Sequence, residues 1–248
     1  MPTLGRRQKS ETEEVDTANW LRSPLFPEYY RDSFHFQSDG WLSAKSAKVY
    51  DTSTETLFAG RQDLMQRTAL LPLASWAAGK KDLRILEVGC GTGKFSTFLR
   101  DNYTDADITL VDLSPFYLEQ ARKNHAKYGK ITCRGRAPSF VQADAASLPF
   151  SDEEFDVVIC MYMFHELPSE ARADVAREMA RVCSSLIVLT DSIQRGDRPE
   201  LDESIANFKK FNEPYYDTFL SEDLGALVEE HGFEPHEKHL CSVTWAAK

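Results

Sequence analysis

Acidic residues and glycines lie at intervals suited to holding a small ligand. Glu87 ends an apolar run, and glycines follow at every second position, as Gly89, Gly91 and Gly93. Glycine accepts positive φ angles and lets a ligand come close to the backbone. A helix that begins after such a turn offers free N–H groups and the positive end of its dipole. We therefore expect an anionic group to dock at residues 89–93.

Two common phosphate-binding motifs do not match this turn. A P-loop ends in Gly-Lys-Ser/Thr, whereas Gly93 and Lys94 are followed by Phe95. The dinucleotide fingerprint G-x-G-x-x-G requires a glycine at the position that Lys94 occupies. The sequence reads E-x-G-x-G-x-G instead, which excludes a P-loop and makes an NAD(P)-dependent oxidoreductase only an alternative.

A second acid, Asp112, follows the glycine turn in the sequence. Asp112 ends the apolar segment 107–112, about 20 residues after the turn, and Ser114 and Pro115 then supply a helix cap and a first helical residue. Nucleotide-binding α/β proteins place a ribose-hydroxyl acceptor at this spacing. We expect the Asp112 carboxylate to bind a ribose.

Together these motifs resemble those of S-adenosylmethionine (SAM)-dependent methyltransferases of the Rossmann-like class. The E-x-G-x-G-x-G form resembles their first motif. Asp144, a small residue and then Leu-Pro-Phe at 148–150 are similar to the end of their third strand. Residues 155–167 read F-D-V-V-x-x-x-x-x-x-H-x-L, a pattern of the small-molecule enzymes. The chain resembles the quinone-biosynthesis and related small-molecule methyltransferases, which does not decide the substrate. The resemblance covers about residues 84–191.

The resemblance implies a role for each matched position. It implies that the turn backbone takes the carboxylate of SAM and that Glu87 faces its ammonium group. Asp144 would accept from the adenine amino group, the N–H of Ala145 would meet a ring nitrogen, and a carbonyl near Met161 would face the ammonium. The expected cofactor-binding set is Glu87, Gly89, Cys90, Gly91, Gly93, Asp112, Leu113, Asp144, Ala145 and Met161. No metal is expected.

His165 is the candidate catalytic residue. It follows the predicted strand 155–162 by a few positions, at the edge where ligands bind in sheets of this kind. An imidazole titrates near neutral pH, so it is suited to act as a general base toward a methyl acceptor. The alternative is a structural histidine that bonds to a neighbouring loop.

Composition narrows the class of protein. The chain has 248 residues and a net charge of −10, which argues against a broad nucleic-acid interface. No apolar run approaches the length of a membrane span. The five cysteines form no C-x-x-C pair, as expected for free thiols in a reducing compartment. We expect a cytoplasmic location, and an organellar protein that has lost its transit peptide would look the same.

The chain divides into three expected parts. Residues 1–18 are polar and charged and are expected to form a disordered tail. Residues 19–80 form a cap that combines the aromatic segment 20–41 with helices, in which Tyr50, Leu57, Leu64 and Leu71 recur every seven residues and predict an apolar face. Residues 81–248 form the SAM-binding domain, with a substrate insertion at 192–220.

We therefore predict an α/β fold. It is a Rossmann-like, doubly wound, mostly parallel sheet of seven strands, with a C-terminal antiparallel hairpin and an N-terminal helical and aromatic cap. The expected function is SAM-dependent methyl transfer to a small-molecule acceptor, with the acceptor atom (O, N, C or S) left open. The alternatives are an NAD(P)-dependent oxidoreductase and a non-catalytic SAM-binding regulator.

Overall fold

The computed structural model describes residues 23–32, 40–132, 135–207, 212–240 and 243–247. The tail predicted at residues 1–18 and the first residues of the aromatic segment lie outside this part. The strands are β1 (Arg84–Val88), β2 (Asp107–Asp112), β3 (Ser139–Gln142), β4 (Phe155–Met161), β5 (Cys183–Asp191), β6 (Pro235–Leu240) and β7 (Val243–Ala247). The longer helices are α2 (Ala44–Leu57), α4 (Leu70–Ala77), α5 (Lys94–Asn102), α6 (Pro115–Thr132) and α7 (Ser169–Val182). The short helices are η1 (Glu28–Arg31), α3 (Gln62–Arg67), η2 (Phe164–Glu166), η3 (Pro199–Leu201), α8 (Asp202–Ile205), α9 (Tyr216–Phe219) and α10 (Leu224–Glu229).

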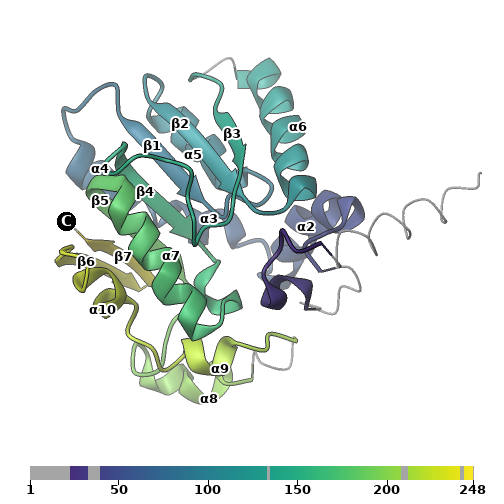
Figure 1. The fold of residues 1–248 in the computed structure, drawn as a ribbon, viewed down its shortest axis with the longest axis vertical. Coiled ribbons are helices and arrows are strands. Elements are labelled where there is room, and N and C mark those ends of the chain that lie inside the picture. Colours follow the sequence, from purple (N-terminus) through teal and green to yellow (C-terminus); the bar gives the residue numbers. More distant parts are fainter. Residues whose placement is uncertain (1–22, 33–39, 133–134, 208–211, 241–242, 248) are drawn as a thin grey trace, which may run out of the picture.

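The strands form one sheet in the order β3-β2-β1-β4-β5-β7-β6 (Figure 1). The first five strands are parallel, whereas β7 runs antiparallel to both β5 and β6. The strand order reverses between β1 and β4, and ligands of open α/β sheets bind at the carboxyl ends of the strands at such a switch point. The predicted α/β, Rossmann-like class with a parallel sheet is confirmed.

Helices cover both faces of the sheet because the strand side chains alternate between two apolar cores. Leu86 and Val88 of β1 pack with α7 and α10 on one face. Ile85, which precedes Leu86, packs with α4, α5 and α6 on the other face. Glu87 alternates with Leu86 and Val88, so its carboxyl group is buried at the end of β1, on the side of α5.

The N-terminal cap differs in part from the prediction. Ser43 caps α2 as expected, since its hydroxyl accepts the N–H of Ser46 at 3.2 Å. The predicted apolar face of heptad-spaced leucines is wrong: Leu57, Leu64 and Leu71 are each at least half exposed. These leucines lie on three separate helices, because Gly60 adopts φ +77° and ends the first one. A seven-residue spacing therefore does not define a common face here.

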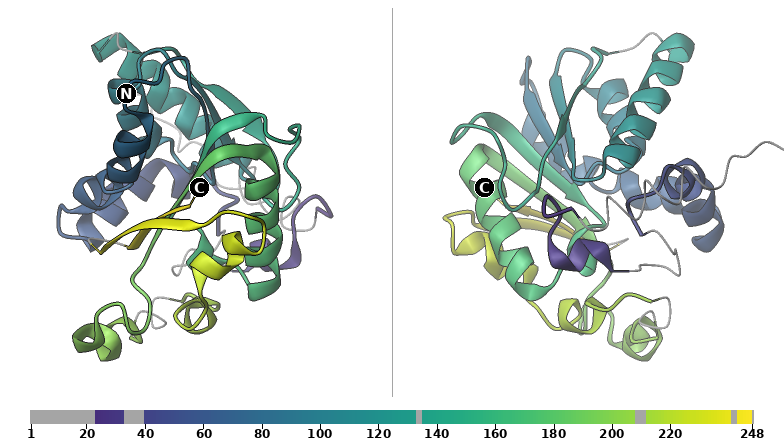
Figure 2. Two further views of the ribbon diagram at one scale, coloured as in Figure 1. Left: turned by 90° about the vertical axis from the view of Figure 1, so that its left-hand side faces the viewer. Right: turned by 45° about the vertical axis from the view of Figure 1, so that its right-hand side comes forward.

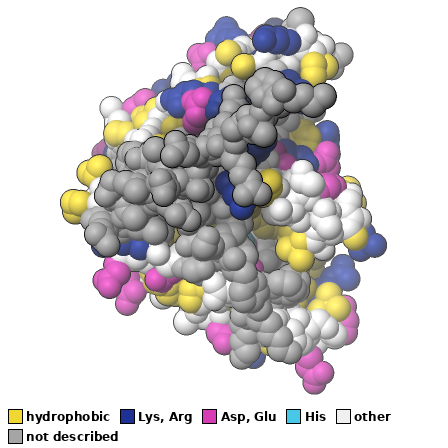
Figure 3. Space-filling model, turned by 90° about the vertical axis from the view of Figure 1, so that its right-hand side faces the viewer, with side chains coloured by type: hydrophobic (Ala, Val, Ile, Leu, Met, Phe, Trp, Pro, Cys, Tyr) yellow, Lys and Arg dark blue, Asp and Glu magenta, His cyan; other side chains and the backbone are white. Residues whose placement is uncertain are grey.

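The C-terminal part lies at one edge of the molecule. Figure 2 shows β6 and β7 in yellow beside the rest of the sheet, whereas α8 and α9 lie apart from it. On the face in Figure 3, acidic, basic and apolar side chains of the described residues are interspersed. Within the described residues, no helix has the length and apolar content that a bilayer crossing demands.

Candidate functional site

A cavity of about 670 Å³ opens at the switch point of the sheet. Its floor consists of the residues that follow β1, β2, β3 and β4, and its walls come from α2, the η2 turn and α9. Nine of the ten predicted cofactor residues line it, namely Glu87, Gly89, Cys90, Gly91, Asp112, Leu113, Asp144, Ala145 and Met161. Carboxyl ends of parallel strands meet at one edge of a sheet, which is why residues far apart in sequence converge here.

Gly93 is the tenth predicted residue, and it does not line the cavity. Its φ is +70°, and a Cβ built on it would lie 3.1 Å from atoms of Ala121 and His125. Its carbonyl accepts the hydroxyl of Ser96 at 2.9 Å. Gly93 is therefore required for packing the turn against α6, and its contact with a ligand stays a prediction.

Gly91 is required for a different reason. Its φ is +53°, and among the described residues other than its chain neighbours a Cβ built on it would meet only the ring of Tyr117 within 4 Å, at 4.0 Å. The missing side chain therefore leaves room on the cavity side of the turn. A Cβ on Gly89 would instead clash with Met163 Sδ at 2.6 Å. The turn thus combines close packing with open space for a ligand.

Glu87 is a buried acid with spare hydrogen-bonding capacity. Its side chain is 2% exposed, and its Oε2 has no hydrogen-bond partner in the described structure. Burial raises the pKa of Glu87 to about 8, against the lowering effect of the Ser96 hydroxyl, and the charge of Asp112 raises it further. A buried carboxyl with an unsatisfied oxygen is suited to a cationic ligand group, such as an ammonium.

The Asp112 carboxylate already accepts backbone N–H groups of the protein. Its Oδ2 accepts the N–H of Gly91 at 2.7 Å, and its Oδ1 accepts the N–H of Ser114 at 2.8 Å. Burial raises its pKa to about 6 in spite of these hydrogen bonds, which lower it. Each carboxylate oxygen retains a second lone pair that is able to accept from a ribose hydroxyl. Asp112 therefore fixes the glycine turn, a role that its sequence position did not reveal.

Asp144 lies at the far end of the cavity floor. Its Oδ1 accepts the N–H of Ala146 at 2.9 Å, so the residue turns the chain directly after β3. Asp144 and Ala145 both line the cavity, next to Leu113 and Ala143. This places a carboxylate and a backbone edge beside apolar side chains, an arrangement suited to a flat heteroaromatic ring.

His165 lies on the η2 turn, in a tight pair with the last residue of β5. Its Nδ1 is 2.6 Å from Asp191 Oδ1, and its Nε2 is 3.6 Å from Glu166 Oε1. Burial alone lowers the pKa of His165, but the charges of Asp191, Glu166 and Glu213 outweigh this effect and raise the pKa to about 10. A raised pKa favours the protonated ring, which is a donor and not a base.

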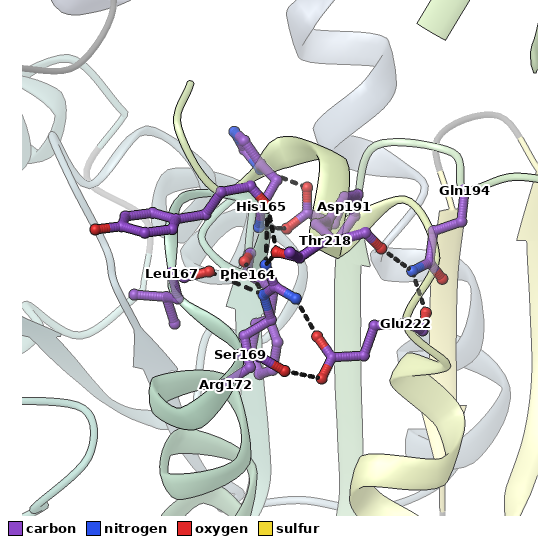
Figure 4. Close-up of polar contacts among 11 residues, drawn as sticks. Phe164, His165, Leu167, Ser169, Arg172, Asp191, Gln194, Thr218 and Glu222 are labelled. Atoms are coloured by element: carbon purple, nitrogen blue, oxygen red, sulfur yellow. Dashed lines mark hydrogen bonds and ion pairs between the residues drawn. The ribbon is translucent and has the colours of Figure 1, made fainter. Parts of the chain in front are cut away.

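A buried arginine holds the His165 turn in place (Figure 4). Arg172 on α7 is 0% exposed, and its Nε donates to the carbonyls of Phe164 and Leu167, both at 3.0 Å. Its Nη2 donates to Thr218 Oγ1 at 2.7 Å, and its Nη1 pairs with Glu222. Arg172 therefore ties the turn that carries His165 to the segment after residue 212.

That segment also forms one wall of the site. The rings of Tyr216 and Phe219 meet the His165 ring edge-on, with centroids 6.1 and 6.0 Å away. Ser192, Glu213 and Tyr216 of the predicted insertion line the cavity. This wall includes the Pro-Tyr-Tyr sequence at 214–216.

The cap supplies the opposite wall. Tyr29, Tyr30 and Trp41 of the predicted aromatic segment line the cavity, and residues 33–39 lie outside the described structure. The hydroxyl of Thr92 donates to Asp51 Oδ1 at 2.6 Å, and Lys94 pairs with Glu55 and Asp63, so the cap is bonded to the glycine turn. Sequence reasoning missed Asp51, Tyr117, Glu166 and Glu213, because single residues on helices and in loops carry no motif.

Comparisons with known proteins find similarity to methyltransferases. Residues 85–185 match a family described as a methyltransferase domain. A fatty-acid O-methyltransferase of Mycolicibacterium smegmatis is 35% identical over 127 residues, which are 50% of this chain and 42% of that protein. A demethylmenaquinone methyltransferase of Thermus thermophilus is 32% identical over 132 residues, which are 53% of this chain and 56% of that protein. The chain thus spans about half the length of these curated relatives.

A solved structure extends the similarity to the fold. A SAM-dependent methyltransferase from Aquifex aeolicus superposes with a TM-score of 0.58 at 17% identity, over 83% of this chain and 97% of that one. At this identity the likeness concerns the fold alone. The resemblance predicted from the E-x-G-x-G-x-G, Asp112 and Asp144 motifs is confirmed by the domain match and the curated relatives.

Proposed function

We infer, from the premise that this chain is a SAM-dependent methyltransferase, that the whole protein transfers a methyl group from SAM to a small-molecule acceptor. The observation that carries the proposal is the cavity at the switch point, where an open glycine turn, a buried acid with a spare oxygen and two further carboxylates converge. The charge and hydrogen-bonding capacity of these groups suit the ammonium, ribose and adenine of SAM.

The residues proposed to hold SAM divide by chemistry. Glu87 would face the ammonium group, since its Oε2 lacks a partner in the described structure. Asp112 would accept from the ribose through its remaining lone pairs, and Asp144 from the adenine amino group. Bound SAM supplies a methyl group on a sulfonium, and the neutral thioether that remains is a good leaving group. What remains for the protein is alignment in a site that excludes water, which can supply about 7–11 kcal/mol.

The acceptor would bind between the cap and the insertion. Both segments contribute aromatic rings, among them Tyr30, Trp41, Tyr50 and Tyr216. Apolar and aromatic linings are usual for small-molecule pockets. We propose that the aromatic segment before α2 and the insertion 192–220 form a lid. Hydrogen exchange with SAM and acceptor present should protect both segments together, and protection of neither would contradict the lid.

We propose His165 as the residue that handles a proton at the acceptor. In the ligand-free protein the surrounding carboxylates raise its pKa, which favours the charged ring. A cationic ligand in the same cavity would disfavour the imidazolium and lower this pKa, which would allow base catalysis. His165→Ala should then reduce turnover by about 10²–10⁴-fold with SAM affinity retained. A folded variant with near-normal turnover would show that the histidine is structural.

Two measurements test the function itself. Calorimetry or thermal shift with SAM, S-adenosylhomocysteine (SAH) and NADH should show binding of the first two only, and binding of NADH alone would favour the oxidoreductase. Incubation with methyl-labelled SAM and a panel of phenols, fatty acids, quinols and amines then tests transfer. SAM binding with no labelled product from any acceptor class would favour the non-catalytic regulator.

A further inference from the structure

We propose that the hydroxyl of Tyr117 donates a hydrogen bond to the carboxylate of bound SAM, so that Tyr117 determines specificity for the amino-acid part of the cofactor. The proposal rests on SAM binding at the switch-point cavity. It concerns a residue that none of the sequence motifs includes.

The Tyr117 hydroxyl is a buried donor without a partner. Tyr117 lies in the first turn of α6, lines the cavity and is 2% exposed. Its Oη has no hydrogen-bond partner in the described structure. Buried hydroxyl groups nearly always find a partner, and each exception requires an explanation. A ligand that brings an acceptor to this point would provide one.

The ring of Tyr117 lies beside the glycine turn. A Cβ built on Gly91 would lie 4.0 Å from Tyr117 Cδ1, with no other described atom beyond its chain neighbours within 4 Å. The N–H of Tyr117 donates to Ser114 Oγ at 3.2 Å, and that hydroxyl in turn donates to the carbonyl of Trp41 at 2.6 Å. The residue is therefore fixed to both the sheet edge and the cap.

Two cap rings hold the phenol in one orientation. Tyr117 meets Trp41 and Tyr50 edge-on, with centroids 5.4 Å away in both cases, and those two rings meet each other at 6.0 Å. Burial and the nearby charges of Glu166 and Asp112 raise the pKa of Tyr117 well above its ordinary value. The phenol therefore stays protonated and is available as a donor.

A carboxylate at the turn needs such a donor. Three N–H groups of the turn already donate within the protein: Cys90 to Val111, Gly91 to Asp112, and Gly93 to Cys90. Lys94, which follows the turn in sequence, is paired with Asp63 at 2.5 Å and with Glu55 at 3.3 Å. Because the surrounding acids would repel a carboxylate, a fixed neutral donor at this point would contribute strongly to its recognition.

The test is a double-difference experiment on binding. Calorimetry at pH 7 compares SAM with decarboxylated SAM, which differs only in lacking the carboxylate, for the wild type and for Tyr117→Phe. We expect the variant to bind SAM about tenfold more weakly, since a hydrogen bond to a charged group is lost, and to bind decarboxylated SAM as the wild type does. Without ligand, the variant should be at least as stable as the wild type, because only an unpartnered hydroxyl is removed.

Controls separate this role from a structural one. Tyr103→Phe removes a phenol that does not line the cavity and should change neither affinity. Equal weakening of both ligands, or of neither, in Tyr117→Phe would overturn the proposal. If the variant does not fold, the wild type alone decides: it should prefer SAM at least about tenfold, and equal affinity would mean that no group reads the carboxylate. Failure of the wild type to bind SAM at all would instead contradict the proposed function.

Discussion

Glu87 offers a direct test of the site because its ionisation is opposed in the ligand-free protein and favoured by a cation. Its pKa is about 8 in the folded protein and 4.5 ordinarily. The folded state therefore holds this proton more tightly than the unfolded chain does. The contribution of Glu87 to the free energy of unfolding is fully present below pH 4.5 and is lost as the pH rises through 8. The difference of about 3.5 in pKa corresponds to about 5 kcal/mol.

The substitution Glu87→Gln mimics the protonated acid. Chemical denaturation of the ligand-free proteins at pH 5 and pH 9 should show similar stability at the lower pH. At pH 9 the variant should be more stable, by up to about 5 kcal/mol, since it has no charge to bury. A stability difference that does not grow with pH would contradict the buried, unpaired state of this carboxyl.

SAM binding should favour ionised Glu87, whereas folding without ligand favours the protonated acid. If the ammonium of SAM pairs with ionised Glu87, the fraction of protein ready to bind is about 1/101 at pH 6 and 1/11 at pH 7 for a pKa of about 8. The dissociation constant should therefore fall about ninefold over this interval, which lies below the ordinary pKa of an α-amino group. Calorimetry in buffers of different ionisation enthalpy should detect about 0.9 proton released at pH 7. Both effects are taken as differences from Glu87→Gln, because Asp112 and His165 also titrate. Equal pH dependence in the two proteins would refute the pairing.

Three further substitutions test other parts of the site. Asp144→Ala should weaken SAM and SAH alike by calorimetry, since both carry adenine, and a response of only one would assign the residue to the sulfur instead. Gly91→Val should abolish SAM binding, because the side chain would strain a φ of +53° and enter the cavity, whereas Gly79→Ala, with φ +78° and open space, should retain full affinity. Arg172→Met should cost about 3–5 kcal/mol of unfolding free energy by leaving Glu222 and buried carbonyls unpaired, and Arg177→Met, on the exposed side of the same helix, should cost under about 1 kcal/mol. Equal losses in the two arginine variants would contradict the anchoring role.

The sequence predicted most of the residues that line the cavity at the strand ends, because local patterns determine where they lie. A strand that ends in an acid, followed by a turn that needs positive φ, leaves few alternatives for where Glu87, Gly91 and Asp112 lie. Local patterns also predict the parallel sheet, because its strands are nearly continuous apolar runs.

The rest depends on contacts between distant segments. The heptad leucines failed as a guide because the intervening Gly60 separates the helices, so their spacing has no common axis. The charge state of His165 depends on Asp191, 26 residues away, and on Glu213, which only the folded chain brings near. Arg172 has no motif, and its importance follows from five hydrogen bonds that span residues 164–222.

The bonds between the cap and the glycine turn limit how this chain can be rearranged. The matched family region begins at residue 85, yet Thr92, Lys94 and Ser114 within it bond to residues 41–63 outside it. A fragment that begins at residue 85 would leave these groups without partners and would expose the rings of the cap interface. A chimera that takes its cap from a relative would need matching residues at all three positions. A segment of this chain that is exchanged as one piece therefore has to include residues before the matched domain.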